Sequence, residues 1–364
     1  MTEAGCDGSR PASRSNLYGF VAWLLLGLLG VDALVWATRE CWRQHSPDDY
    51  RERLHSCRQR PRDLICLGGS PVSEGIDPLW LVGVTLPDGS RCVSPFNLGL
   101  PGGTTSEFWH ALRHGASSPP KLIVYGITAS DLNDRRQEPH GAYSLMDWDD
   151  LASWVWARPE SAEYITRHFV AARLGQAWQL FRYRDGIRMA LAEWAERACP
   201  GCCPAAAEQS RLNRDYAARL RRGDGFAPNA GFRHRRYDQF KAAGGVVTNF
   251  GFLDGYRLTG GHSGYLHRIL DYAQQHDTAV VLLDMPVTED LERRYPQAFE
   301  QYRSLLAALV QQRGVTLLCG HRDAVGLGDA HFADLIHLNQ DGADRLSAWL
   351  RDQLQALGQR SQTR

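Results

Sequence analysis

Five short apolar runs separated by helical stretches constrain the fold of this chain more than any other feature. They lie at residues 64–67, 93–97, 122–127, 279–283 and 315–319. The first run ends in Gly68-Gly69-Ser70, which is typical of a buried strand that enters a tight turn. Short apolar strands that alternate with helices indicate a parallel sheet with helices on both faces. The sequence therefore predicts an α/β fold with three layers, α/β/α, around a five-stranded parallel sheet.

The middle of the chain has a different pattern. We find no strong strand between about residues 140 and 245, so we predict a mainly helical insertion at 136–257. Val170, Leu174, Trp178 and Phe181 follow one another at helical spacing, and we expect this stripe to be core. The α/β domain is then formed by residues 61–135 and 258–364.

The N-terminal segment Leu17 to Ala37 is 21 residues long and contains one charge, Asp32. About 20 apolar residues span a bilayer, so we predict a transmembrane anchor within residues 1–38, followed by a solvated stalk at 39–60. A cleaved signal peptide is the alternative. We expect the remainder of the chain to be exported in both cases. The positive-inside rule does not support that orientation, because Arg39 and Arg43 follow the apolar segment.

Composition excludes several classes of protein. The 41 basic and 41 acidic side chains give no net charge, which argues against a dedicated nucleic-acid-binding protein. Of the nine cysteines, Cys199, Cys202 and Cys203 form one cluster. No second cysteine pair supplies the other ligands of a zinc site, so we expect a local disulfide in an exported domain. We find no dinucleotide fingerprint and predict no metal and no cofactor.

Three loops with chemically active side chains follow predicted strands, where open α/β sheets place their active sites. The first presents Ser70 on a sharp turn, as a nucleophile requires. The second, Asn97 to Thr105, contains Gly102 and can point backbone N–H groups at a developing oxyanion. The third contains Asp334 three residues before His337, a spacing that lets the carboxylate orient the imidazole. Each loop also has an ordinary structural explanation; their combination favours a serine enzyme.

These three blocks resemble the SGNH (GDSL-like) hydrolase superfamily. Its blocks are Gly-Asp-Ser after a strand, Asn-x-Gly-x-x-Gly, and Asp-x-x-His before a helix. The resemblance covers about residues 61–135 and 258–355, and it implies a flavodoxin-like sheet. It also implies Ser70 as nucleophile, His337 as general base, Asp334 as its partner, and the N–H groups of Ser70 and Gly102 as oxyanion donors.

The chain departs from that pattern at two places. Gly69 stands where the superfamily has Asp. The third block of the superfamily supplies an Asn as a further oxyanion donor, and here Ser130 aligns with that Asn while Asn133 lies three residues later. The third donor is therefore Ser130 or Asn133.

A narrower likeness is to membrane-anchored SGNH-type proteins that work beside membrane-bound O-acyltransferases, such as those of alginate acetylation and teichoic acid D-alanine transfer. It implies an extracytoplasmic enzyme that transfers or hydrolyses acetyl-type groups on a cell-envelope glycan through an acyl-Ser70 intermediate. The alternatives are a simple esterase, a catalytically silent protein that presents a glycan to an O-acyltransferase, and a phosphate or nucleotide binder that uses Gly68-Gly69-Ser70.

Overall fold

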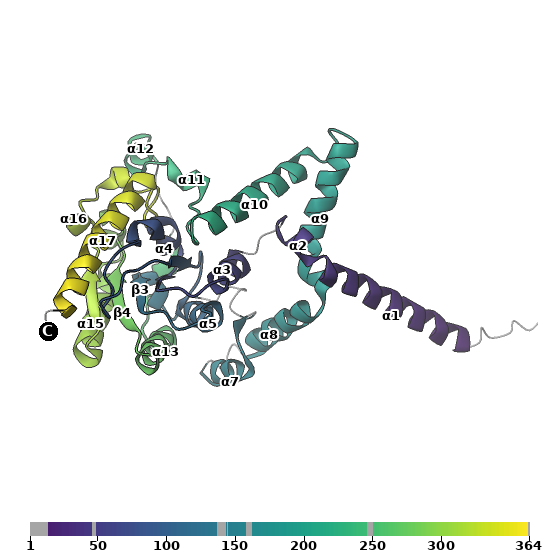
Figure 1. The fold of residues 1–364 in the computed structure, drawn as a ribbon, viewed down its shortest axis with the longest axis horizontal. Coiled ribbons are helices and arrows are strands. Elements are labelled where there is room, and N and C mark those ends of the chain that lie inside the picture. Colours follow the sequence, from purple (N-terminus) through teal and green to yellow (C-terminus); the bar gives the residue numbers. More distant parts are fainter. Residues whose placement is uncertain are drawn as a thin grey trace, which may run out of the picture. The chain divides into compact units, whose positions relative to one another are not determined.

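The computed structural model describes residues 14–45, 49–136, 143, 145–157, 162–245 and 250–362 (Figure 1). Its sheet has five parallel strands in the order β2-β1-β3-β4-β5. The strands are β1 (Leu64–Gly68), β2 (Pro95–Gly99), β3 (Leu122–Ile127), β4 (Ala279–Asp284) and β5 (Thr316–Cys319). The predicted α/β fold and its parallel sheet are confirmed.

The second strand begins two residues later than predicted. The backbone N–H groups of Val93 and Ser94 donate to the Asp63 carboxylate, at 2.9 and 3.0 Å, and the Val93 side chain is 72% exposed. Residues 93 and 94 are therefore held by a side chain, and pairing with β1 starts at Pro95.

The chain divides into two compact units, which we describe separately. The larger one, here called the sheet unit, contains residues 47–172 and 212–364. The smaller one, here called the α1 unit, contains residues 1–46 and 173–211. Because α8 (Ala162–Ala177) and α10 (Pro204–Arg222) cross these boundaries, the predicted insertion at 136–257 contributes to both units.

Helices cover the sheet from two sides. α4 (Ser70–Gly75) packs against α17 (Gln340–Gln362), and α5 (Thr105–Gly115) packs against α13 (Gly261–Gln275), with the strands between these pairs (Figure 1). The chain between β4 and β5 forms α14 (Glu289–Arg294) and α15 (Pro296–Arg313), and α16 (Arg322–Val325) follows β5. Every residue of β1, β2 and β3 is buried, as expected for a parallel sheet covered on both faces.

Part of the predicted stalk belongs to the core of the sheet unit. Residues 39–60 contain α2 (Arg39–Arg43) and α3 (Asp49–Arg58), and α3 packs against α5 and β2. Leu54 and Cys57 of α3 are buried, and the fully buried Arg53 donates to Ser73 Oγ at 2.7 Å. The charged composition of this segment suggested a solvated stalk, but its few apolar side chains and one arginine face inward.

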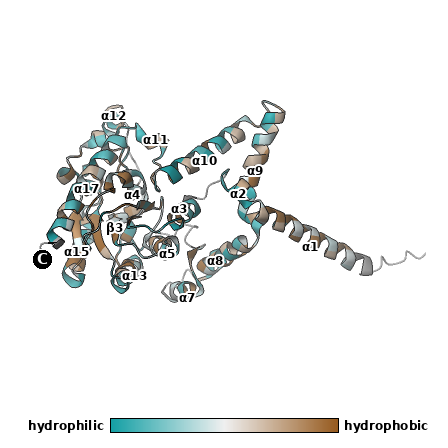
Figure 2. Cartoon of the chain, in the orientation of Figure 1, coloured by the Kyte–Doolittle hydropathy of each residue, from teal (hydrophilic) through white to brown (hydrophobic). Residues whose placement is uncertain are grey.

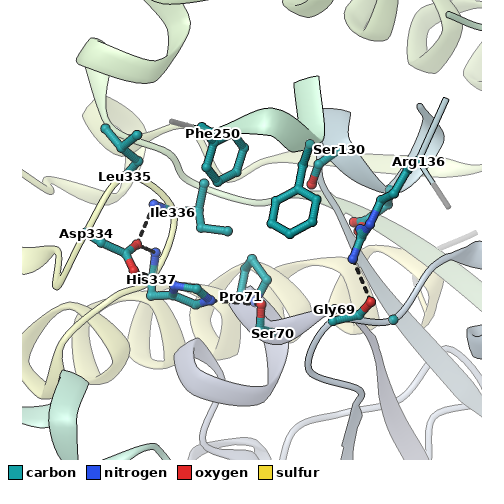
Figure 3. Close-up of a pocket in the computed structure, with 14 residues that line it drawn as sticks. Gly69, Ser70, Pro71, Ser130, Arg136, Phe250, Asp334, Leu335, Ile336 and His337 are labelled. Atoms are coloured by element: carbon teal, nitrogen blue, oxygen red, sulfur yellow. Dashed lines mark hydrogen bonds and ion pairs between the residues drawn. The ribbon is translucent and has the colours of Figure 1, made fainter. Parts of the chain in front are cut away.

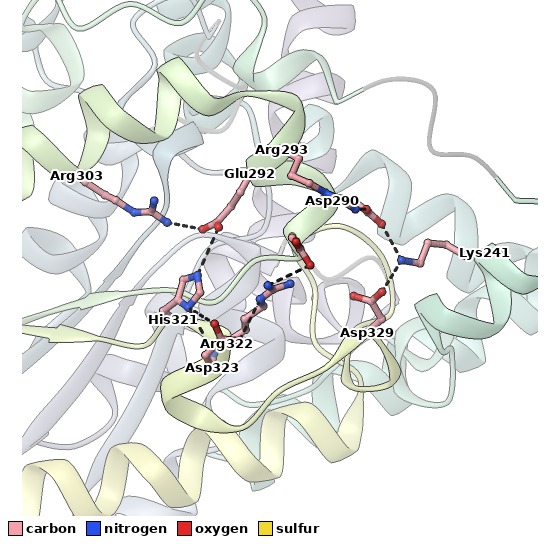
Figure 4. Close-up of polar contacts among 10 residues, drawn as sticks. Lys241, Asp290, Glu292, Arg293, Arg303, His321, Arg322, Asp323 and Asp329 are labelled. Atoms are coloured by element: carbon pink, nitrogen blue, oxygen red, sulfur yellow. Dashed lines mark hydrogen bonds and ion pairs between the residues drawn. The ribbon is translucent and has the colours of Figure 1, made fainter.

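The described part of the insertion contains helices and no strand, as predicted. They are α7 (Trp148–Ala157), α8, α9 (Gln179–Ala198), α10, α11 (Ala230–Arg233), α12 (Tyr237–Ala242) and the short turn Gly251–Leu253. Lys241 of α12 donates to Asp290 of α14 at 2.9 Å and also to Asp329 (Figure 4). These ion pairs attach the last part of the insertion to the α/β domain.

The α1 unit contains α1 (Arg14–Ala37), α2, α9 and parts of α8 and α10. Within α1, Tyr18–Ala37 is long and apolar enough to cross a membrane. Apolar residues extend along α1 in Figure 2.

Two expectations for the insertion are wrong. Val170, Leu174, Trp178 and Phe181 are 40%, 65%, 48% and 45% exposed, so the stripe is not core. Cys199, Cys202 and Cys203 are free cysteines. The turn that contains them is held instead by the Glu196 carboxylate, which accepts from the N–H groups of Gly201 and Cys203 at 2.6 and 2.7 Å.

Candidate active site

Ser70 lies where β1 ends and α4 begins. Gly68 has a positive φ of 151°, and a Cβ there would lie 2.3 Å from the Gly126 carbonyl oxygen of β3. Only glycine allows the strand to turn this tightly against its neighbour. The turn places Ser70 in the first turn of α4, at the carboxyl edge of the sheet where ligands bind in such folds.

The structure brings Ser70, His337 and Asp334 into one hydrogen-bonded chain. His337 Nε2 lies 2.8 Å from Ser70 Oγ, and His337 Nδ1 lies 2.8 Å from Asp334 Oδ2 (Figure 3). Ser70 is 267 residues from His337 in the sequence, whereas Asp334 is only 3 residues from it. A hydroxyl, an imidazole and a carboxylate are thus within contact distance of one another, an arrangement that can activate a serine hydroxyl.

Backbone N–H groups of the loop before α17 fix the orientation of the Asp334 carboxylate. Asp334 Oδ1 accepts from the N–H groups of Ile336 and His337, both at 2.9 Å. Burial raises the pKa of Asp334, but hydrogen bonds from the His337 ring and from these two N–H groups outweigh that effect and leave it below its usual value. Asp334 therefore stays ionised at neutral pH and can stabilise a protonated His337.

The insertion supplies one wall of the histidine site. The Phe232 ring of α11 stacks on the His337 ring with centroids 4.6 Å apart and planes 18° apart. This contact limits rotation of the imidazole away from Ser70. The sequence gives no sign of Phe232, because a stacking contact over more than 100 residues leaves no local pattern.

Two backbone N–H groups near Ser70 can serve as oxyanion donors. Gly102 and Ser70 both line the same cavity, and among the described residues neither N–H has a protein acceptor. Gly102 has a φ of +74°, a conformation that glycine adopts without strain. Its carbonyl oxygen accepts from Arg136 Nη2 at 2.6 Å, so Arg136 holds the turn that carries this glycine.

The structure separates the two candidates for the third donor. Ser130 lines the cavity, whereas Asn133 does not. The Asn133 amide donates to the Phe252 carbonyl at 2.9 Å, and its oxygen accepts from the N–H groups of Arg135 and Arg257 at 3.2 and 3.0 Å. Asn133 therefore fixes surrounding loops, which corrects its assignment as a candidate oxyanion donor.

The Ser130 hydroxyl has its own hydrogen-bond partner. Ser130 Oγ lies 2.9 Å from Thr128 Oγ1, and Thr128 Oγ1 donates its single hydrogen to Asp131 Oδ2 at 2.9 Å. Ser130 must then donate to Thr128, because a hydroxyl has only one hydrogen to give. In this arrangement Ser130 presents lone pairs to the cavity, and it would have to rotate to donate to an oxyanion.

A buried ion pair lies next to the turn that carries Gly102. Arg136 Nη1 is 3.6 Å from Asp131 Oδ1, and the two side chains are 10% and 3% exposed. Burial raises the pKa of Asp131 and the Arg136 charge opposes that rise. A Cβ on Gly69 would lie 3.4 Å from Asp131 Oδ1, so an aspartate at position 69 would place a second carboxylate beside the first. This contact gives a physical reason for glycine at that position.

The cavity has a volume of about 270 Å³ and a partly apolar wall (Figure 3). Its polar residues are Ser70, Ser130, Asp131, Arg136, Asp334 and His337, and its apolar side chains are Pro71, Phe250, Phe252, Leu335 and Ile336. Three lining residues, Arg136, Phe250 and Phe252, come from the predicted insertion and were not among the residues predicted for the site. The sequence offered two signals for them. Arg136 is a charged residue shortly after Ser130 and Asn133, and Phe250 and Phe252 form an aromatic pair. Among the described residues no group of three or more His, Cys, Asp or Glu side chains is placed to hold a metal ion.

No protein-family model matches the chain, and no curated protein matches it. Among solved structures, the chain is similar to the lipase/acylhydrolase from Enterococcus faecalis, with 11% identity and a TM-score of 0.35, over 81% of this chain and 96% of that one. A likeness at this identity and TM-score carries no argument about activity.

Proposed function

We propose that this protein is a serine esterase or O-acyltransferase that works through an acyl-Ser70 intermediate. The observation that carries the proposal is the hydrogen-bonded chain from Ser70 through His337 to Asp334, at 2.8 Å for each contact, beside the cavity. These contacts support the three roles that acyl transfer requires, which are a nucleophile, a base and a carboxylate that orients the base.

The first half of the reaction acylates the serine. Ser70 Oγ attacks the ester carbonyl carbon while His337 Nε2 takes the hydroxyl proton, and the carbonyl oxygen becomes an oxyanion that the N–H groups of Ser70 and Gly102 stabilise. The tetrahedral intermediate collapses, the carbon–oxygen bond to the leaving alcohol breaks, and His337 returns the proton to that alcohol. Asp334 stabilises the imidazolium that exists between these two events.

The second half releases the acyl group. His337 takes a proton from water or from an acceptor hydroxyl, which attacks the acyl-Ser70 carbonyl, and Ser70 leaves with that proton. Water gives hydrolysis, and a glycan hydroxyl gives transfer. An assay with a soluble acyl donor distinguishes them, because transfer produces an acylated sugar in proportion to added acceptor while hydrolysis produces free acid.

The cavity size supports a small acyl group. A volume of about 270 Å³ is below the roughly 300–1,000 Å³ that is usual for drug-sized ligands. We expect acetyl esters to be cleaved faster than octanoyl esters, in a series of p-nitrophenyl esters of increasing chain length. Equal or higher kcat/KM for octanoate would exclude an acetyl-type substrate.

The location and the partner of this enzyme are part of the same proposal. α1 contains one segment, Tyr18–Ala37, that meets the length and composition of a membrane span. We infer an anchored enzyme with the sheet unit outside the cytoplasm, supplied with acyl groups by a membrane-bound O-acyltransferase. A reporter that is active only after export, fused after Arg364, tests the orientation.

The decisive experiment is covalent labelling by a fluorophosphonate probe, which reacts with an activated serine. We expect labelling of the wild type and none of Ser70→Ala. Ser117→Ala is the matched control, because Ser117 is an exposed serine outside the cavity lining. A wild type that is folded but unlabelled and inactive on acetyl esters would favour a catalytically silent protein that presents a glycan.

A further inference from the structure

The acidic residue within the apolar segment of α1 has a definite partner. Asp32 Oδ1 accepts a hydrogen bond from the backbone N–H of Leu180, at 2.6 Å. Leu180 is in the first turn of α9, where backbone N–H groups lack partners within the helix and the helix dipole favours a negative charge. Asp32 therefore caps α9, which satisfies a carboxylate that would otherwise be costly in a membrane.

This hydrogen bond fixes the depth of α9 relative to α1. Asp32 lies five residues before Ala37, the end of the apolar segment. At about 1.5 Å per residue, the start of α9 is about 7.5 Å inside the end of that segment. Close packing continues at Gly186, where a Cβ would lie 2.3 Å from the Trp42 carbonyl oxygen.

The chain around this point exposes large apolar side chains. Leu174, Trp178 and Phe181 are 65%, 48% and 45% exposed, and the rings of Trp178 and Phe181 stack with centroids 6.3 Å apart. These three residues lie at the turn from α8 into α9, here called the 174–181 turn. Exposed apolar side chains grouped in this way mark an interaction site.

We propose that the 174–181 turn is a second membrane contact, whose side chains Leu174, Trp178 and Phe181 lie in the boundary between headgroups and acyl chains of the bilayer that α1 spans. The inference rests on the membrane location given under the proposed function. The depth of about 7.5 Å agrees with the 5–10 Å at which interfacial helices bury their apolar face. Tryptophan and phenylalanine are side chains that such a boundary accepts.

The charges beside the 174–181 turn also fit a lipid surface. The Arg184 guanidinium lies 4.0 Å over the Phe181 ring, and Arg173 and Arg182 lie nearby in sequence. Long arginine side chains can bury their stems beside apolar groups while their charges stay at the headgroups. A lipid surface therefore explains why aromatic, aliphatic and basic side chains occur together at the 174–181 turn.

The test is quenching of tryptophan fluorescence in lipid nanodiscs that contain only the full-length protein. Lipids brominated at acyl carbons 6 and 7 or at 11 and 12 serve as shallow and deep quenchers. The difference between the wild type and Trp178→Phe isolates the emission of Trp178. We expect that emission to be quenched by both sets of brominated lipids.

Trp194 is the matched control, because it is 49% exposed and lies on the same helix. It is about 24 Å further along α9 at 1.5 Å per residue, so we expect the emission lost in Trp194→Phe to be unquenched. Unquenched Trp178 would overturn the proposal and would favour a protein partner at the 174–181 turn. Equal quenching of Trp194 would place α9 flat on the bilayer and would overturn the depth set by Asp32.

Quenching of Trp23, which lies near the centre of α1, shows whether α1 itself spans the bilayer. This measurement distinguishes a failure of the second contact from a failure of the proposed membrane location. If the emission lost in Trp23→Phe is unquenched, α1 does not span the bilayer, and the second contact is excluded with it. Fluorophosphonate labelling of Ser70 in the same nanodiscs reports on the enzyme independently of either result.

Discussion

The sheet unit and the α1 unit use apolar side chains in opposite ways. In the sheet unit, the strands β1 to β3 are buried throughout, and their apolar residues form one continuous core with α5, α13 and α17. In the α1 unit, large apolar residues such as Leu26, Trp23 and Trp178 are exposed. A parallel sheet offers two faces that helices can cover, whereas a few long helices leave much of their surface without a protein neighbour.

The same difference applies to polar groups. In the sheet unit, the Asp334 carboxylate accepts three hydrogen bonds, from the N–H groups of Ile336 and His337 and from the His337 ring. In the α1 unit, the Asp32 carboxylate accepts one hydrogen bond, from the backbone N–H of Leu180 at the start of α9. We therefore expect substitutions in the sheet unit to change chemistry and substitutions in the α1 unit to change membrane contact.

Removal of the nucleophile or the base should have the largest effect. We expect Ser70→Ala and His337→Ala each to reduce kcat on an acetyl ester by about 10⁴-fold or more, because the two groups act as one unit. The double variant should be no worse than either single one. Melting temperature and retention in the membrane should stay near wild-type values. Substantial activity in purified Ser70→Ala would exclude the acyl-serine mechanism.

Asp334→Asn should reduce kcat by roughly 10²- to 10⁴-fold, because the amide can hold the ring but cannot stabilise its positive charge. The pKa of Asp334 is lowered in the folded protein, so its ionisation stabilises the fold above the unfolded value of about 3.9. That contribution is lost as pH falls through the folded value. Thermal unfolding from pH 7 to pH 3 should therefore show a smaller loss of stability in Asp334→Asn than in the wild type.

Arg136→Met should reduce kcat by about 10- to 100-fold, with a smaller change in KM, because the Gly102 donor would no longer be held in place. Arg135→Met is the matched control, since Arg135 is an exposed neighbour outside the cavity lining. Arg136→Lys keeps the charge but not the fixed geometry of the guanidinium, and we expect partial recovery. The rate of fluorophosphonate labelling provides a second measurement of the same oxyanion site.

Loss of stability must be separated from loss of positioning in that experiment. Arg136→Met leaves Asp131 buried without its cation, which is destabilising. Adding Asp131→Asn removes the uncompensated charge, so the double variant should regain melting temperature but not kcat. Recovery of both would show that Arg136 contributes to folding alone.

The smallest effect is expected near the end of the apolar segment of α1. Asp32→Ala removes the cap of α9 and should destabilise the α1 unit by about 0.5–2 kcal/mol, measured by thermal unfolding in detergent. Asp32→Asn keeps an oxygen acceptor and should cost less. Neither change should alter fluorophosphonate labelling of Ser70, and a large loss of labelling would contradict the division between the two units.

Local sequence determined the strands, the apolar span and the three loops of the site. Five apolar runs predicted the sheet, because strands buried on both faces have no polar alternation. Gly68-Gly69-Ser70 predicted the turn, since a positive φ and a close backbone approach require glycine. The Asp334 to His337 spacing predicted their contact, because three residues bring the two side chains onto one short loop.

Tertiary structure alone decided everything that depends on partners distant in sequence. Arg136 holds Gly102 and Phe232 stacks on His337, and neither contact leaves a periodic signal in the chain. The stripe from Val170 to Phe181 has the spacing of a core helix, yet it is exposed, because periodicity shows which residues share a face and not what covers it. Asp32 reads as an isolated charge in an apolar segment until the fold places the start of α9 beside it.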